Sequence, residues 1–592
     1  ANTVADSTKF SISQFGVPAI NAAGSVVFSG SAFKAGLFRH NVYRGGNPTL
    51  DKLFGTDTPL FGSRIITVET GRFAINDQGQ IAFKYLLANG VSGVGVANPT
   101  TPPSPPLPAV VATLGQQVTG ENSSTVYSSF GTPQVGVFAG KYKVNKLTTS
   151  ALFGADGSVK IRTGLLGTTL LGSTLASVSS PCGDAVLAKL RTVPGSITSA
   201  NNVVLLRSLA SGIPTVVAQT GTVVPGLPSG VTIKSFGAID GQGNTLFFLA
   251  KLKGTGIVVG RDMALCAALP DGNVNVLVKK GDTVQGRTVS SLTTLTASSG
   301  IAAEGRWRMG NDHFGVLLGF SGSNQSMYRI PGTSTGPDDW TALIETGIIT
   351  DGGGVLNGKR IAKINLASFG PDSAAALVTL AAESGVITKA NDTAIVTRNI
   401  GASYVTLARE GATLLTDADS NPQVGVTIRS LSKVVVGANG SVAFVIGASN
   451  SSVGLGLAYS TNGSTWRLLA NTGSPTPIGS TWSTFPLMVL PDEPGVGPVF
   501  TATLKPNAAE GITTANASGV WTLAADGSLR QLLAQGQSVS VGMSTKNIRS
   551  ILTLTPSAGS AGAASTHDST GTVSAVVQFT DGSKSLLRTV LP

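Results

Sequence analysis

Three histidines, His40, His313 and His567, are the first residues to consider for catalysis or metal binding. None has a second ligand at the spacing of a metal site, and none lies in a serine or cysteine nucleophile motif. The most polar surroundings are those of Asn311-Asp312-His313, which we interpret as a loop. The sequence therefore predicts no catalytic residue, no metal ligand and no cofactor.

The two cysteines are Cys182 and Cys266. Neither belongs to a CxxC motif or a Cys/His cluster, so we expect no metal site there. Two interpretations stay open. Cys182 and Cys266 can form one disulfide in an oxidising compartment, or they can be two separate buried thiols.

Two short motifs imitate known sites. Ser460–Trp466 resembles a shortened Asp-box, the hairpin motif of sialidases, and we interpret it as a hairpin whose tryptophan packs in the core. Asp417–Asn421 imitates the first half of a calcium loop. However, Pro422 replaces the turn glycine and Ile428 replaces the acidic twelfth residue, so the sequence predicts no calcium site.

Composition excludes several classes of protein. The 592 residues carry 41 Lys and Arg against 30 Asp and Glu, a formal charge of +11. Only 12% of the residues are charged, about half of the usual share. The densest basic spots are pairs such as Lys279-Lys280, so we predict no nucleic-acid-binding surface.

Hydropathy and the first residue bear on localisation. No apolar run reaches the roughly 18 residues that span a bilayer, so we predict no transmembrane segment. The longest run, Ala374–Ala382, is expected to be a core strand. The sequence begins at Ala1, which fits a removed signal peptide, and its few charges and many Ser, Thr and Gly favour a secreted or cell-surface protein.

An apolar pair followed after two or three residues by glycine recurs about every sixty residues. The clearest copies are Val110–Gly115, Val216–Gly221 and Leu468–Gly473. Looser copies end at Gly55, Gly281, Gly347, Gly411 and Gly536, and a poor copy lies near Gly167 or Gly172. This period indicates a repeat architecture.

A second motif, Asn-x-x-Gly-x-Val-x-Phe, lies between these anchors, as in Asn21–Phe28 and Asn76–Phe83. Asn and Gly accept the positive φ of a tight turn, and the apolar residues that follow predict a buried strand. Asn-Gly or Asp-Gly pairs, such as Asn462-Gly463 and Asp526-Gly527, mark further hairpins. Each unit therefore predicts about four antiparallel strands.

These units predict an all-β chain that folds as a single large β-propeller of about ten four-stranded antiparallel blades. The approximate units are 21–75, 76–134, 135–181, 182–240, 241–298, 299–370, 371–437, 438–491, 492–567, and 568–592 completed by 1–20. Strands from the N- and C-termini are expected to share the last blade and close the ring. Eight or nine blades, two propellers, or an open β-solenoid are the alternatives.

The Asn-x-x-Gly-x-Val-x-Phe units resemble the bacterial tandem-repeat proteins described by an NxxGxxxAF motif. The resemblance is clear at Asn21–Phe28 and Asn76–Phe83 and partial elsewhere. It implies a secreted or surface protein and no established enzymatic activity.

We expect a structural or binding protein that associates with other proteins, or with copies of itself, at the cell surface without catalysis. Its low charge weakens repulsion between copies and so favours self-assembly. The alternative is a glycan-binding or glycan-active propeller, sialidase-like or a lyase, with its site at the central channel. A sialidase-like site requires clustered arginines and a Tyr/Glu pair.

Overall fold

The computed structural model describes residues 19–590 with internal gaps. The gaps are 22–24, 35–36, 45–51, 61, 72–73, 77, 99–107, 132, 134–136, 145–146, 155, 157–158, 163–172, 174, 179–185, 208–214, 225–226, 243–244, 270–272, 295–312, 349–357, 370–371, 413–425, 438–439, 450–453, 491–496, 542–543, 554–556, 560–563, 566–571 and 583. The helical segments within the described ranges are two single 3-10 turns, η2 (Pro337–Asp339) and η3 (Ala508–Glu510). The all-β prediction is therefore confirmed.

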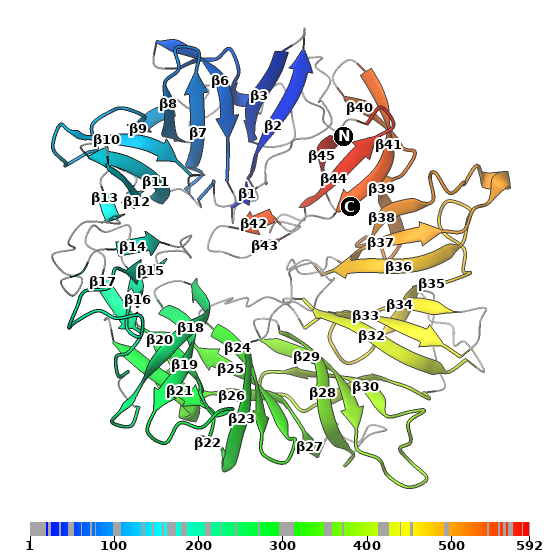
Figure 1. Ribbon diagram of the computed structural model, residues 1–592. Helices are drawn as coiled ribbons and strands as arrows, with labels where there is room; N and C mark the ends of the chain where they lie inside the picture. Colours follow the sequence, from blue (N-terminus) through cyan, green and yellow to red (C-terminus); the bar gives the residue numbers. More distant parts are fainter. Residues whose placement is uncertain are drawn as a thin grey trace.

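Ten sheets follow one another around a ring, in chain order (Figure 1). We name the four repeating strands of each blade A to D. Blade 1 contains β1 (Ala19–Ile20), β2 (Val26–Lys34), β3 (Leu37–Arg44) and β4 (Lys52–Gly55). Blade 2 contains the short β5 (Pro59–Leu60), then β6 (Ser63–Glu69), β7 (Ile81–Leu87), β8 (Ser92–Ala97) and β9 (Pro108–Thr113). Blade 3 contains β10 (Thr125–Phe130), β11 (Val137–Val144), β12 (Leu147–Gly154) and β13 (Val159–Arg162). Blade 4 contains β14 (Leu175–Val178), β15 (Val186–Leu190), β16 (Val203–Arg207) and β17 (Thr215–Gln219). Blade 5 contains β18 (Val231–Gln242), β19 (Thr245–Gly254), β20 (Met263–Ala268) and β21 (Val274–Lys279).

The second half of the ring repeats this order. Blade 6 contains the short β22 (Thr283–Val284), then β23 (Arg287–Thr294), β24 (His313–Phe320), β25 (Gln325–Pro331) and β26 (Thr341–Glu345). Blade 7 contains the short β27 (Gly347–Ile348), then β28 (Arg360–Phe369), β29 (Ser373–Leu380), β30 (Thr393–Asn399) and β31 (Val405–Arg409). Blade 8 contains β32 (Ile428–Val436), β33 (Val442–Ala448), β34 (Leu455–Ser460) and β35 (Arg467–Asn471). Blade 9 contains β36 (Trp482–Val489), β37 (Val499–Leu504), β38 (Ser518–Leu523) and β39 (Leu529–Ala534). Blade 10 contains β40 (Ser538–Val541), β41 (Ser544–Thr553), β44 (Thr572–Phe579) and β45 (Lys584–Val590).

The prediction of about ten blades in one propeller is thus confirmed. Within each blade the consecutive strands pair antiparallel. Strand A carries a β-bulge near its start, for example between Ile233 and Ser235 in blade 5 and between Ile428 and Ser430 in blade 8. A bulge adds local twist, which lets each blade cross its neighbour at an angle.

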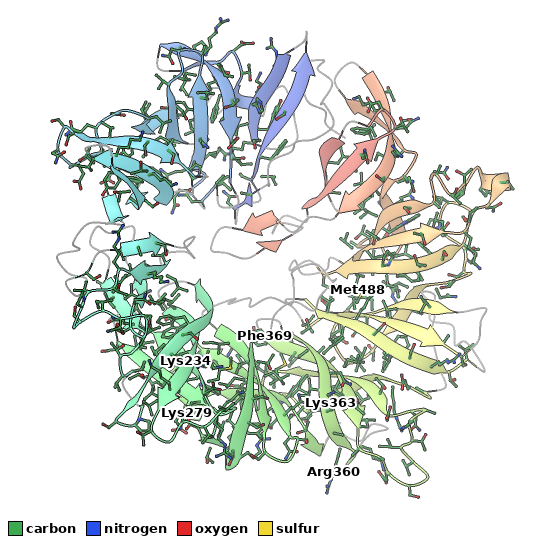
Figure 2. All side chains as sticks on the ribbon, viewed as in Figure 1. Lys234, Lys279, Arg360, Lys363, Phe369 and Met488 are labelled. Atoms are coloured by element: carbon green, nitrogen blue, oxygen red, sulfur yellow. The ribbon has the colours of Figure 1, made fainter. Side chains whose placement is uncertain are left out.

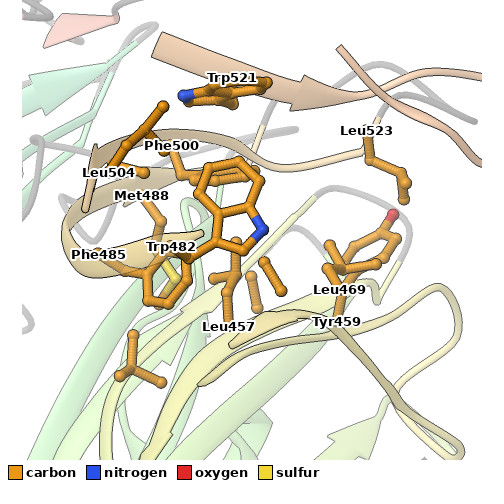
Figure 3. Packing of buried hydrophobic residues seen from close by; sticks show 14 of the residues in the cluster. Leu457, Tyr459, Leu469, Trp482, Phe485, Met488, Phe500, Leu504, Trp521 and Leu523 are labelled. Carbon is orange, nitrogen blue, oxygen red and sulfur yellow. The ribbon is translucent and has the colours of Figure 1, made fainter. Parts of the chain in front are cut away.

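Most of the hydrophobic core lies between blades, and one further cluster, around Leu190 and Val204, lies within blade 4. Separate clusters join blade 1 to 2, 2 to 3, 4 to 5, 5 to 6, 6 to 7, 7 to 8, 8 to 9 and 9 to 10. Figure 3 shows the cluster between blades 8 and 9, where the Trp482 and Trp521 rings meet edge to face with centroids 4.7 Å apart. Each buried aromatic side chain of this kind contributes about 2–3 kcal/mol. A single blade cannot bury its faces alone, so the ring is stable only as a whole.

The Asn-x-x-Gly turns join strands A and B. Asn21 Oδ1 accepts a hydrogen bond from the Ser25 N–H (2.8 Å), and Asn76 Oδ1 accepts one from the Gln80 N–H (2.9 Å). Asn21 Nδ2 also donates to the Asn76 carbonyl across the blade boundary (3.1 Å). The repeated asparagine therefore closes its own turn, and in blade 1 it also binds the next turn.

A strand from the beginning of the chain pairs with a strand from its last forty residues at blade 1. β42 (Ser557–Gly559) lies between strands A and B of blade 10 in sequence, but it pairs parallel with β1, and β43 (Ala564–Ser565) pairs with β42. Both short strands lie on the inner side of the ring in Figure 1. Segments far apart in the sequence thereby close the ring.

Residues 568–592 supply two strands of blade 10, β44 and β45, and strand A of that blade, β41, precedes them in the chain. β44 and β45 pair with each other, and β44 pairs with β41, in register Ile548 to Phe579. Among the described residues, blade 10 has counterparts of strands A, B and C but not of strand D. Residues 1–18 lie outside the described ranges, so the idea that they complete this blade stays a prediction.

No helix in the described ranges has the length and apolarity to span a membrane.

Candidate interaction rim

Two kinds of connection lie at the same end of every blade. Because neighbouring strands are antiparallel, the B–C loop and the exit of strand D share one end, and the A–B and C–D turns share the other. Figure 2 places Arg360, at the start of strand A of blade 7, at the outer edge of the ring, and Phe369, at the end of that strand, nearer the centre. We call the outer end, with its B–C loops and D–A connections, the rim.

Strand D of blade 4 ends in a Thr-Gly corner at the rim. Thr220 Oγ1 accepts a hydrogen bond from the Val203 N–H of strand C (3.1 Å). The Gly221 N–H donates to the Ile233 carbonyl in strand A of blade 5 (2.7 Å). The same bond to the next blade is made by Gly115, Gly281, Gly411, Gly473 and Gly536. The periodic glycine of the sequence is therefore the joint between consecutive blades.

The first anchor is displaced by two residues from its expected place. Asp57, at φ 71°, donates its N–H to the Ile65 carbonyl of blade 2 (2.9 Å) and so occupies the joint position. Gly55 instead packs on Asn41, because a Cβ at residue 55 would lie 1.8 Å from the Asn41 Oδ1. Aspartate tolerates this left-handed conformation better than most residues, which explains why no glycine is needed.

Blades 4, 7 and 9 share one B–C loop with the sequence Ile-Thr-x-Ala-Asn. In blade 7, Asn391 Oδ1 accepts from the Thr388 N–H (2.7 Å) and Asn391 Nδ2 donates to the Val386 carbonyl (3.0 Å). Asn201 and Asn516 make the same two bonds in blades 4 and 9. The asparagine thus holds the loop by itself, and the side chains at the loop apex can vary.

The corner glycine packs directly on this asparagine. Gly411 has φ 77°, and a Cβ there would lie 2.9 Å from the Asn391 Cβ. The equivalent pairs are Gly221 with Asn201 and Gly536 with Asn516. The joint between blades and the B–C loop therefore form one packed unit at the rim.

Blade 5 has a shorter B–C loop that is closed by the same backbone hydrogen bond, without the internal bridge and the asparagine of the other three. The Leu252 N–H donates to the Asp262 carbonyl (2.6 Å), as the equivalent residues do in blades 4, 7 and 9. At the apex, where those blades carry Thr-Ser, Thr-Lys and Thr-Thr, blade 5 carries Val258-Val259. These two side chains are 55% and 100% exposed, and Arg261 replaces the loop asparagine.

Basic side chains from strands A, B and D and from the B–C loop of blade 5 lie at its rim. They are Lys234, Lys251, Lys253, Arg261, Lys279 and Lys280. Asp262 pairs with Lys251 at 3.2 Å, and Asp282 pairs with Lys279. Although burial by itself raises the pKa of Asp262, the hydrogen bond and charge of Lys251 and the charge of Lys280 hold that pKa below its usual value. The sequence shows only the pair Lys279-Lys280, because the other four come together through strand pairing.

His40 is the histidine that the structure supplies with a serine. Ser31 Oγ and His40 Nδ1 lie 2.9 Å apart, on directly paired residues of β2 and β3. Burial lowers the pKa of His40 below its usual 6.5, against the opposing charge of Glu69. A neutral imidazole beside a hydroxyl has the geometry of an activated nucleophile, but Ser31 is only 8% exposed and faces the neighbouring strand. We therefore assign this pair to the joining of β2 and β3.

Arg287, Tyr328 and Glu345 converge in blade 6. Arg287 Nη2 lies 2.5 Å from Glu345 Oε1 and 3.0 Å from the Tyr328 hydroxyl, and its guanidinium lies 4.2 Å from the Phe320 ring centroid. Ser326 Oγ donates to the same carboxylate oxygen (2.9 Å). Because these groups bind one another at the blade corner, they join the strands of blade 6.

Of the cysteines and the other two histidines, the structure describes Cys266 and His313. Cys266 is buried on β20 and has no disulfide partner among the described residues, and burial raises the pKa of its thiol to about 12. Cys182, His567 and Asp417–Asn421 lie outside the described ranges, so the pairing of Cys182 with Cys266 stays a prediction. His313 begins β24.

The Asp-box-like segment is a C–D turn of blade 8. Asn462 Oδ1 accepts from the Ser464 and Thr465 N–H groups (2.9 and 3.2 Å). The Trp466 ring meets Phe444 edge to face with centroids 5.4 Å apart, in the cluster between blades 7 and 8. This contact confirms the interpretation as a structural hairpin.

The comparison with known proteins identifies a family. No protein with a curated description matches the sequence. The Dos1 propeller is 8% identical, with a TM-score of 0.25, over 71% of this chain and 86% of that one. Sqt1 of Chaetomium thermophilum, bound to the N-terminus of ribosomal protein L10, is 9% identical, with a TM-score of 0.22, over 75% of this chain and 97% of that one. Residues 185–509, more than half of the sequence, match the DUF7453 family. The chain therefore belongs to DUF7453, a family of unknown function.

Proposed function

We propose that this propeller is a secreted or cell-surface protein that binds other proteins, or copies of itself, in envelope assembly without catalysis. The observation that carries the proposal is the rim, where one hydrogen-bonded loop frame recurs in blades 4, 7 and 9 with different apex residues. Blade 5 carries a shorter loop, closed by the same backbone bond, in the same place. A rigid frame with variable exposed tips is a common way to present binding residues. The low share of charged residues, 12%, supports close approach between copies.

Native mass spectrometry and sedimentation over a wide concentration range test this proposal. We expect association with copies of the chain or with proteins of an envelope fraction. Lys389→Glu, at the exposed apex of the blade 7 loop, is expected to weaken that association. Ser464→Glu, on an exposed C–D turn away from the rim, is the matched control and is expected to have no effect. A protein that stays monomeric and retains no envelope protein contradicts the proposal.

A further inference from the structure

We propose that the rim of blade 5 docks on an anionic lipid surface. This inference rests on the proposed binding role of the rim and names a partner for one sector of it. Two properties of that sector support the proposal. Its loop tip, Val258-Val259, is apolar although the fold does not require apolar residues there, and more basic than acidic side chains surround this tip.

The tip stands clear of the rest of the molecule. Val258 and Val259 lie between Gly256 and Gly260, and a Cβ at either glycine would meet nothing within 4 Å. Val223, on the neighbouring D–A connection, is 51% exposed. The two segments are anchored in the same cluster through Leu227 and Ile257, which are partly buried there. The exposed valines therefore project from loops that are themselves fixed.

The fold does not require apolar residues at this apex. The equivalent positions are Thr198-Ser199 in blade 4, Thr388-Lys389 in blade 7 and Thr513-Thr514 in blade 9. Those loops make the same closing bond and the same apex turn bond, as Asn201 N–H to the Thr198 carbonyl matches Arg261 N–H to the Val258 carbonyl, with polar tips. An apolar pair that is exposed without a structural reason indicates a contact with something outside the chain.

The charges around the tip select the kind of partner. With Asp262 and Asp282 paired to lysines, Lys234, Lys253 and Arg261 have no carboxylate partner among the described residues. Lys189 and Arg191 add two exposed basic groups at the rim of blade 4. Clustered Lys and Arg beside an apolar tip is the composition that binds anionic membranes, where each basic residue near the surface strengthens binding.

The shape favours lipid over an acidic protein. The fully exposed Val259 forms a convex tip, and a protein partner must supply a matching groove to bury it. A bilayer interface accepts a convex apolar tip without a preformed groove. An acidic polypeptide is therefore an outcome of the test rather than the proposal.

Vesicle co-sedimentation of the full chain tests the inference. We expect binding to phosphatidylcholine vesicles that contain about one-third phosphatidylglycerol, little binding to phosphatidylcholine alone, and loss of binding at high salt. Arg261→Asn, which restores the residue of the other three loops, is expected to lower the partition coefficient about fivefold. Val258→Thr with Val259→Thr, which copies the apex of blade 9, is expected to lower it as well. Both changes lie on exposed side chains, so the thermal midpoint is expected to stay constant.

The control is the same kind of change on another blade. Val386→Thr with Lys389→Asn alters an exposed valine and a lysine at the rim of blade 7 and is expected to leave vesicle binding unchanged. Equal loss in this variant, or no preference for anionic vesicles in the intact chain, overturns the inference. Binding of polyglutamate without binding of vesicles also overturns it, in favour of an acidic protein partner. A chain that self-associates but ignores anionic vesicles refutes only the lipid partner, whereas a monomer that binds vesicles but no envelope protein refutes only the assembly function.

Discussion

At the scale of single residues, His40 makes the stability of the protein depend on pH. Its folded-state pKa lies below the usual 6.5 because burial disfavours the imidazolium. The unfolded chain therefore binds the proton more readily, and stability falls as the pH drops below 6.5 until the folded-state pKa is reached. We expect the thermal midpoint to decrease between pH 7.5 and 5.5, and we expect a smaller decrease in His40→Gln.

The matched comparison for this prediction is His313→Gln, measured over the same pH range. This comparison separates the part of the decrease in thermal midpoint that is due to His40 from the part that is due to another histidine. An unchanged pH slope in His40→Gln shows that the buried imidazole is not the cause.

Residue types could predict some of these features and not others. The Asn462 turn was predictable because an Asn-Gly pair dictates local backbone geometry by itself. The pairing of Ser31 with His40 was not, because it depends on the register of a hairpin whose turn has no such signal. Asp57 took the place expected for a glycine because its side chain also tolerates positive φ.

At the scale of an element, the corner glycine is constrained twice. A residue that replaces Gly411 must adopt φ 77°. Its side chain must also displace Asn391, because the added Cβ would lie 2.9 Å from the Asn391 Cβ. Gly385, in the same blade at φ 73°, has nothing within 4 Å. We expect Gly385→Ala to cost about 1 kcal/mol from backbone strain and Gly411→Ala to cost about 2–3 kcal/mol.

Hydrogen exchange of the segment 383–412 measures this local stability in each variant. The prediction requires Gly411→Ala to open this segment more than Gly385→Ala does. Equal protection in the two variants contradicts the packing of the glycine on the asparagine.

The strands and their period were predictable, whereas the rim was not recognised. The corner glycines repeat because each joint needs a backbone N–H at positive φ. The Ile-Thr-x-Ala-Asn loops at Asn201, Asn391 and Asn516 also repeat in the sequence, so the signal was present. They were missed because only some regions of the ring carry them and their common role appears only with the side-chain bonds.

At the scale of the whole molecule, the contact between β1 and β42 holds the ring closed. Ala19 faces Ala558 in parallel register. Adjacent strands lie about 4.8 Å apart, within the Cα separation that a disulfide allows. We expect Ala19→Cys with Ala558→Cys to form a disulfide on oxidation, seen as a reversible shift in gel mobility and a higher thermal midpoint.

The control places the second cysteine one strand further away. Ala19→Cys with Ala564→Cys is expected to stay reduced, because β42 separates β43 from β1. Efficient crosslinking of this second pair, or none of the first, is incompatible with the closure described above.

The sequence could predict that the ring closes, but it could not predict which strand closes it. A repeating sheet with exposed edges implies that distant parts of the chain meet. The strand that meets β1 is three residues long and comes from a stretch rich in Ser, Ala and Gly, which has no alternation to mark it. Its parallel partner is nearly the whole sequence away, and such pairing leaves no local signal.

The pairing of β1 with β42 has a consequence for the chain during its synthesis. A ribosome makes β1 long before β42, because the strands of eight complete blades lie between them in the chain. Every nascent chain therefore carries an unfinished first sheet while those blades are translated, and a product of premature termination never completes it. Such fragments keep an unpaired strand edge on β1, and we expect them to associate with other chains more readily than the complete protein does.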